Sequence, residues 1–219
     1  DSVLLPTMSK VQDSVEQIKN MTRRAIKTSV YIMAPLMMGL AFLSESLISL
    51  VLTDKWLPCA PFMRIFCVTF MFYPIHTANL NAIKAMGRSD LFLKLEVLKK
   101  VIGVILLLST MKFGVLAIAY SMLISSFTSQ IINSWPNRKL LKYGYIEQLK
   151  DILPSILLAM FMGIIVGMLS GLNIPLLIKL VVQILVGGSI YILGSVIFKM
   201  ESFYYLKEII KTLLKKNKE

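Results

Sequence analysis

The chain has 219 residues, of which 56% are hydrophobic and only 16% are charged, and its mean hydropathy is +0.72. A soluble domain of this length is not so apolar, so the composition predicts an integral membrane protein. The formal net charge is +12, but the basic residues fall between apolar runs and in the tail. We interpret them as charges that orient the chain in a membrane, which excludes a nucleic-acid partner.

The first residues predict a connector. The chain begins at Asp1, without an initiator methionine, and we expect it to be a piece of a longer protein. Residues 1–28 are expected to contain the end of a preceding helix and then a cytoplasmic amphipathic connector along the membrane surface. Val11, Val15 and Ile18 begin the apolar face of that connector.

Apolar stretches then predict six transmembrane helices in an all-α bundle, with amphipathic interfacial helices at both ends. The expected spans are residues 29–52, 60–84, 92–111, 115–135, 152–172 and 175–198. The fifth span carries Gly163, Gly167 and Gly171, a small-residue face suited to close helix packing. Residues 199–219 form a basic amphipathic tail that should lie on the inner leaflet.

The distribution of basic residues predicts the orientation. All but four of the 24 Lys and Arg residues fall on one side of the six predicted spans, and the exceptions are Lys55, Arg64, Lys112 and Lys179. Because basic loops stay in the cytoplasm, both ends of the chain are expected there.

The third predicted span is unusually charged, since Lys94, Glu96, Lys99 and Lys100 lie in its first half. A span takes about 20 residues, and too few apolar residues follow Lys100 to form one alone. These charges must therefore lie within membrane depth, where each needs a partner, a water-filled cavity or a route to the surface.

Three runs carry a resemblance to a known family. They are residues 6–13 (Pro-Thr-Met-Ser-Lys-Val-Gln-Asp), 52–58 (Leu-Thr-Asp-Lys-Trp-Leu-Pro) and 86–96 (Met-Gly-Arg-Ser-Asp-Leu-Phe-Leu-Lys-Leu-Glu). The chain resembles the carboxy-terminal half of Wzx-type lipopolysaccharide and oligosaccharide flippases, within the multidrug, oligosaccharidyl-lipid and polysaccharide flippase superfamily. Residues 143–154 also fit, so the resemblance covers nearly the whole chain.

The resemblance implies a transporter made of two helix bundles that face each other across a cavity. Its implied substrate is a polyprenyl-pyrophosphate-linked oligosaccharide, such as an O-antigen or exopolysaccharide repeat unit. Alternating access would move this unit from the cytoplasmic to the periplasmic leaflet. The implied partners are membrane lipid and the amino-terminal half of the same transporter.

Basic side chains are the first candidates for substrate binding, because a pyrophosphate must be drawn out of the inner leaflet. We name Lys84, Arg88, Lys99 and Lys100, which cluster around one predicted cytoplasmic turn. Alternatively, Glu96 pairs with Lys100 and the lysines extend to the headgroups. Arg64 is either an outer gate that receives substrate or a headgroup anchor.

Polar side chains within the spans are further candidates. His76, Asn79 and Asn81 could hydrogen-bond sugar hydroxyls or relay a proton, or they could hold helices together. Glu45 could couple transport to an ion, or it could be a protonated carboxyl bonded to neighbouring serines.

Motifs of ATP hydrolysis, nucleophilic catalysis and metal binding are absent from the sequence, so we predict neither an enzyme nor a cofactor. Three alternatives stay open. A small-molecule or ion antiporter of the same superfamily would need a more acidic cavity. A membrane-bound polysaccharide-assembly enzyme is disfavoured by the short outer loops, and an inactive fragment is the third alternative.

Overall fold

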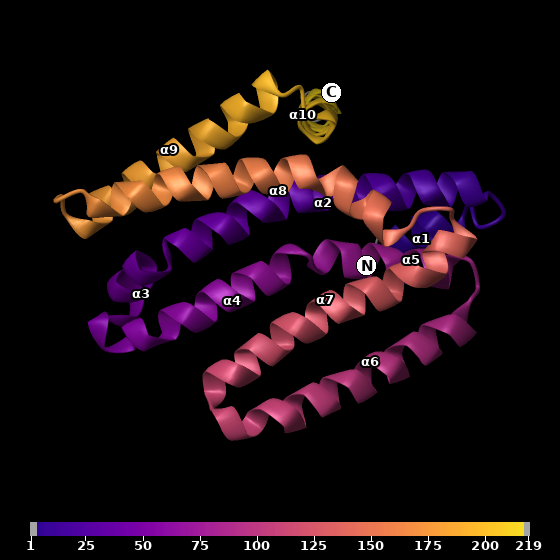
Figure 1. Ribbon diagram of the computed structural model, residues 1–219. Helices are drawn as coiled ribbons and strands as arrows, with labels where there is room; N and C mark the ends of the chain where they lie inside the picture. Colours follow the sequence, from indigo (N-terminus) through magenta and orange to yellow (C-terminus); the bar gives the residue numbers. More distant parts are fainter. Residues whose placement is uncertain (1–3, 217–219) are drawn as a thin grey trace.

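The computed structural model describes residues 4–216, and every element in that range is helical (Figure 1). The elements are α1 (Leu4–Ser9), α2 (Val15–Phe42), α3 (Ser44–Leu52), η1 (Asp54–Cys59), α4 (Ala60–Met71), α5 (Tyr73–Ala85), α6 (Ser89–Thr110), η2 (Met111–Phe113), α7 (Val115–Leu140), α8 (Tyr145–Met168), η3 (Leu169–Gly171), α9 (Leu176–Ile197) and α10 (Glu201–Lys216). The first three residues of the expected connector and the last three of the expected tail lie outside the described residues.

The predicted all-α membrane fold is confirmed. Five helical stretches are long and apolar enough to cross a membrane, namely Val15–Phe42, Asp54–Ala85, Val115–Leu140, Tyr145–Gly171 and Leu176–Ile197. The remaining predicted span is α6, whose 22 residues are long enough but include the four charges named above. This helix lies beside α7 and runs antiparallel to it (Figure 1).

Two predicted spans differ from the observed helices. The first helix begins at Val15 rather than near Ser29, because Ser14 caps it and accepts a hydrogen bond from the Gln17 N–H at 3.4 Å. The expected surface connector is thus largely continuous with the first span. At 28 residues, α2 is about 42 Å long and exceeds a hydrocarbon core of about 30 Å.

In each of the first two predicted spans, the helix is interrupted once. The first is interrupted at Leu43, between α2 and α3, and the second at Phe72, between α4 and α5. The second break comes just before Pro74, whose missing N–H suits the first turn of a new helix.

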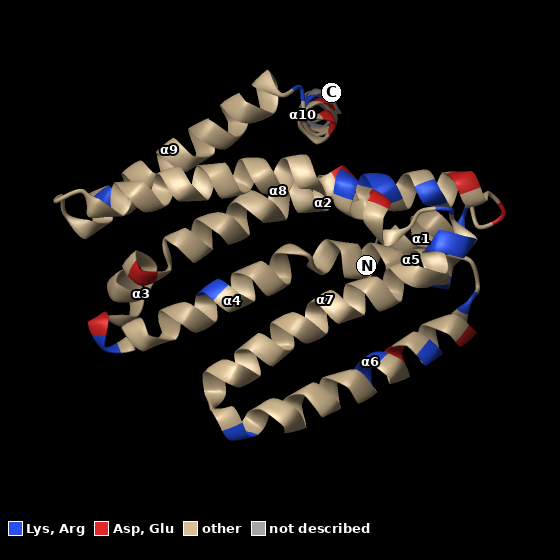
Figure 2. Cartoon of the chain, in the orientation of Figure 1, with Lys and Arg blue, Asp and Glu red and all other residues tan. Residues whose placement is uncertain are grey.

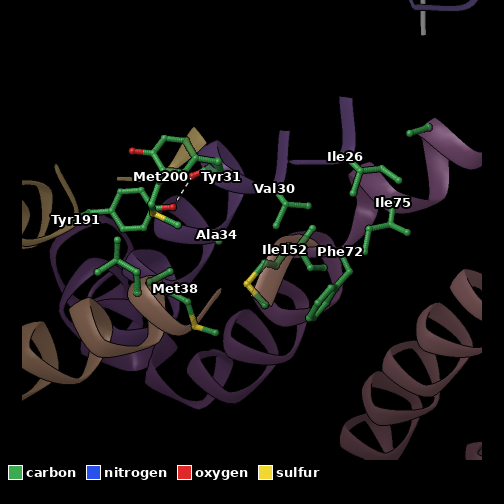
Figure 3. Packing of buried hydrophobic residues seen from close by; sticks show 14 of the residues in the cluster. Ile26, Val30, Tyr31, Ala34, Met38, Phe72, Ile75, Ile152, Tyr191 and Met200 are labelled. Carbon is green, nitrogen blue, oxygen red and sulfur yellow. Dashed lines mark hydrogen bonds between the residues drawn. The ribbon is translucent and has the colours of Figure 1, made fainter. Parts of the chain in front are cut away.

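The core is built around α2, which packs against α8, α4 and α5. Val30, Ala34, Ile75 and Ile152 lie within one buried cluster (Figure 3). Tyr31 extends this core to α9, since its hydroxyl donates to Ser195 Oγ at 2.7 Å and its carbonyl accepts from the Tyr191 hydroxyl at 2.8 Å. The core therefore joins helices that are far apart in the sequence.

The glycines of α8 allow α2 to approach closely. A Cβ atom built on Gly163 would lie 2.5 Å from Phe42 Cδ2, and one on Gly167 would lie 2.9 Å from Phe42 Cδ1. The Phe42 ring therefore occupies the space that two missing side chains leave. Gly171, the third glycine of the predicted small-residue face, has no atom within 4 Å of its Cβ position.

Basic residues gather at one end of the bundle, where α2 begins, α5 ends and α6 begins (Figure 2). We call this the basic end. The four exceptions lie in η1, α4, η2 and the first turn of α9. The charge asymmetry expected from the sequence is thus arranged along the long axis of the helices.

Candidate functional site

The helix α6 turns Lys99 toward the bundle and leaves most of its leucines and valines exposed. The only buried residue among its 22 is Lys99, which is 8% exposed. Its Nζ donates to Glu96 Oε1 at 2.6 Å. This corrects the expected pairing of Glu96 with Lys100, because Lys99 lies on the side of α6 that faces the bundle whereas Lys100 is exposed. Outward apolar residues suit a helix that contacts lipid.

Two adjoining pockets lie between α5, α6 and α7, with volumes of about 620 Å³ and about 380 Å³. Together we call them the α5–α7 pocket. Both are lined by His76, Lys100, Gly103, Leu107, Ser125 and Ser129. The smaller one adds Glu96 and Lys99, and the larger one adds Tyr73 and Ser121. The site therefore combines cations, hydroxyls and an apolar wall.

Serine hydroxyls of α7 form one wall of this pocket. Ser121, Ser125 and Ser129 recur every fourth residue, so they share one helix face. Gly103 of α6 also lines the pocket, and a Cβ atom built there would make an ordinary contact with Ser125 Oγ at 3.7 Å. Sequence reasoning missed these serines, although their spacing of four is visible in the sequence.

His76 joins the pocket to α7. Its Nδ1 lies 2.7 Å from Asn133 Nδ2, and its ring stacks on Tyr73 at 5.8 Å between centroids. The Asn133 side chain on α7 is therefore hydrogen-bonded to the imidazole on α5. His76 is thus held in a fixed orientation at the pocket.

The other two basic candidates have partners of their own. Lys84 Nζ lies 4.3 Å from the centroid of the Phe92 ring, a cation–π contact. Arg88 is exposed and contacts the Asp90 carboxylate through two hydrogen bonds of 3.1 Å. Of the four basic residues predicted to bind substrate, the structure brings Lys99 and Lys100 together at the pocket and leaves Lys84 and Arg88 outside it.

The side chain of Asn79 belongs to a hydrogen-bond network between helices. Its side chain donates to Gln148 Oε1 at 2.8 Å and to Ser134 Oγ at 3.2 Å. It also accepts from Gln148 Nε2 at 2.9 Å and from Asn137 Nδ2 at 2.7 Å. This fully buried network joins α5 to α7 and α8. Asn81 is buried as well and lines neither part of the pocket.

Arg64 and Glu45 form an ion pair toward the other end of the bundle. Arg64 Nη2 lies 2.6 Å from Glu45 Oε1, and Arg64 Nε donates to Ser44 Oγ at 2.9 Å. The Glu45 carboxylate thus contacts the Arg64 side chain of α4, and not the neighbouring serines that the sequence suggested as its partners. The pair ties α4 to the first turn of α3.

Metal coordination finds no support in the part of the chain that the structure describes, where no group of three or more His, Cys, Asp or Glu residues is placed to hold an ion. That the protein has no metal site stays a prediction, which rests on the absence of metal-binding motifs from the sequence.

Comparisons with known proteins place this geometry in context. Residues 1–61 match a family described as polysaccharide biosynthesis protein. An uncharacterized membrane protein of Methanocaldococcus jannaschii, MJ1068, is 26% identical over 189 residues, which are 86% of this chain and 37% of that protein. The lipopolysaccharide biosynthesis protein WzxC of Escherichia coli is 26% identical over 97 residues, 44% of this chain and 20% of WzxC. An uncharacterized membrane protein from the cps region of Klebsiella pneumoniae is 26% identical over 69% of this chain.

A solved structure shares the fold. The lipid II flippase MurJ in an inward closed conformation superposes with a TM-score of 0.73 and 21% sequence identity, over 90% of this chain and 42% of MurJ. The chain thus spans less than half the length of each of these proteins. The comparisons confirm the resemblance found in the sequence: this chain is similar to part of the lipopolysaccharide biosynthesis protein WzxC and has the fold of part of the lipid II flippase MurJ.

Proposed function

We propose that this chain is one half of a transporter that moves a lipid-linked oligosaccharide across a bacterial inner membrane for cell-surface polysaccharide synthesis. The amino-terminal half of the same transporter would face it across a cavity. Alternating access would carry the substrate from the cytoplasmic to the periplasmic leaflet. The names of the matched proteins and the shared flippase fold support this proposal.

The observation that carries the proposal is the α5–α7 pocket. A lipid-linked oligosaccharide has a pyrophosphate, sugar hydroxyls and a long apolar chain, and the pocket offers a complement to each. The Lys100 ammonium suits the pyrophosphate, the α7 serines suit the sugar, and the exposed apolar side of α6 suits the lipid.

A transporter also fits better than an enzyme. The solved structure that shares this fold is a flippase, in agreement with the prediction that the chain is not an enzyme. Because the sequence contains no motif for ATP hydrolysis, the energy for transport would come from an ion gradient or from consumption of the substrate on the far side. Glu45 and His76 remain the candidate residues for such coupling.

Complementation tests the function. The whole protein is expressed in a flippase-null strain, and surface polysaccharide is measured at equal membrane abundance of each variant. Wild type should restore polysaccharide. Lys100→Gln should lower it at least about tenfold, since a charge-assisted contact contributes about 1.5–3 kcal/mol. Lys94→Gln, which removes a positive charge from the same helix away from the pocket, should behave as wild type.

Two other results would change the interpretation. Equal activity of Lys100→Gln and Lys94→Gln would keep the flippase but remove Lys100 from the binding site. If wild type restores no polysaccharide but lowers cellular accumulation of a cationic dye, a small-molecule antiporter would replace the proposal.

A further inference from the structure

A separate pocket of about 560 Å³ lies where α7 ends and α8 begins, at the basic end of the bundle. We call it the junction pocket. Its lining includes Trp135, Arg138, Lys142, Ile146 and Glu147, and it has no lining residue in common with the α5–α7 pocket. The proposed transport role makes no use of it.

Its two cations are held by a rigid piece of backbone. Arg138 lies in the last turn of α7, and Lys142 lies in the short link to α8. Lys142 has a φ of +49°, in the left-handed region that non-glycine residues rarely adopt. Its neighbours Leu141 and Tyr143 are each only 1% exposed. Burial on both sides therefore fixes the link, while Lys142 itself is exposed.

Apolar side chains also line the pocket. Trp135 is 69% exposed, and Ile131 and Ile146 are exposed as well. A tryptophan in this position is typical of the membrane–water interface, where its ring lies at headgroup depth. The junction pocket thus combines two cations with exposed apolar side chains, which suits an amphipathic anion.

We propose that the junction pocket binds the phosphate headgroup of an anionic phospholipid of the inner leaflet. Arg138 and Lys142 contact the phosphodiester, Trp135 lies at the level of the glycerol, and Ile131 and Ile146 contact the acyl chains. The Glu147 carboxylate also lines the pocket, so the three charged side chains together leave one net positive charge. That charge matches a monoanionic phosphodiester better than a more highly charged pyrophosphate, which separates this lipid from the transported substrate.

The two tryptophans of the chain allow a direct test, because Trp56 lies in η1 at the other end of the bundle. The full chain carrying Trp56→Phe is placed in nanodiscs of phosphatidylcholine and phosphatidylglycerol, with bromine on the acyl chains of one lipid at a time. Bromine quenches only nearby tryptophan. Trp135 fluorescence should be quenched more by brominated phosphatidylglycerol than by the same mole fraction of brominated phosphatidylcholine.

Matched variants separate this site from general surface charge. The preference for phosphatidylglycerol should be lost in Arg138→Gln/Lys142→Gln. It should be kept in Lys139→Gln/Lys150→Gln, which removes the same charge at the same end of the bundle outside the pocket. A variant with Trp135→Phe, which reports on Trp56, should show no preference.

Three results would overturn the proposal. One is equal quenching by the two brominated lipids at Trp135, and another is loss of the preference in both double variants. The third is displacement of the quenching lipid by free glycerol phosphate, which would indicate a site for a soluble phosphate instead of a headgroup.

Discussion

The helices α8 and α6 are similar in length but differ in how they are attached. Of the 24 residues of α8, eight are buried, among them Gln148, Ala159 and Gly163. Of the 22 residues of α6, only Lys99 is buried. The helix α8 packs along α2 and α9, whereas α6 packs mainly along α7.

This difference shows what determines packing in a lipid environment. An apolar side chain gains little by moving from lipid to protein, so close approach and hydrogen bonds hold membrane helices together. The helix α8 has both, through the glycines beneath Phe42 and through Gln148. The helix α6 keeps its leucines and valines toward lipid, and its inward side is left for the charged pocket. We therefore interpret α8 as scaffold and α6 as part of the proposed binding site.

The largest effect is expected from breaking the network that joins α5 to α7 and α8. Asn79→Leu should lower the free energy of unfolding by about 3 kcal/mol, since it removes three buried hydrogen bonds to the amides of Gln148 and Asn137. Thermal stability in detergent, followed by size-exclusion chromatography, measures this. Asn173→Leu in the exposed link before α9 should have no effect, and similar melting of both variants would contradict the scaffold role.

The same substitution on the two helices gives a direct contrast. Gly163→Ala on α8 should cost about 1–3 kcal/mol, because its Cβ would overlap the Phe42 ring. Gly103→Ala on α6 should be neutral, because its Cβ would make an ordinary contact with Ser125. Phe42→Leu should suppress the loss in Gly163→Ala. If both alanine variants melt alike, the two helices do not differ in packing.

A smaller effect is expected from the charges of α6. Lys99→Met should lower stability by about 1–2 kcal/mol, because the Glu96 carboxylate, 31% exposed, loses its hydrogen-bonded cation. Adding Glu96→Gln should restore the melting temperature without restoring polysaccharide in the complementation assay. Recovery of both would show that the pair serves packing alone.

The smallest effect concerns α10, which is attached to α2 by the ion pair between Lys27 and Glu201. The hydrogen bond from Lys27 holds the pKa of Glu201 below its usual range. The pair should therefore stabilise α10 docking above a pH of 4.5, the ordinary value, and lose this effect as the pH falls through the lower folded value. Glu201 is 78% exposed, so the gain is below about 1 kcal/mol.

Spin-label distances between α10 and α2 across this pH range measure the docking. Glu201→Gln should remove the pH dependence and Glu208→Gln should keep it. A distance that is constant with pH in the wild type would contradict a role for the ion pair.

The sequence predicts an all-α membrane protein with a basic end, because the lengths of the apolar stretches and the positions of the Lys and Arg residues can be read from the chain alone. It also identifies Lys99 and His76 as residues at membrane depth. It does not predict that Asn79 has amide partners on α7 and α8, since that depends on how three helices meet. Likewise, whether Glu96 pairs with Lys99 or Lys100 depends on which side of α6 faces the bundle. The breaks at Leu43 and Phe72 leave no mark in hydropathy.

The inward lysine of α6 has a consequence for synthesis of the protein. Each charged residue at mid-membrane depth opposes entry of a helix from the translocon by about 2.5–3.5 kcal/mol, and α6 carries four charges in its first half. Only the three residues of η2 and Gly114 separate it from α7, whose serines line the same pocket as Lys99 and Lys100. We expect α6 to wait at the translocon until α7 is made, so that the two helices enter the bilayer together as a hairpin.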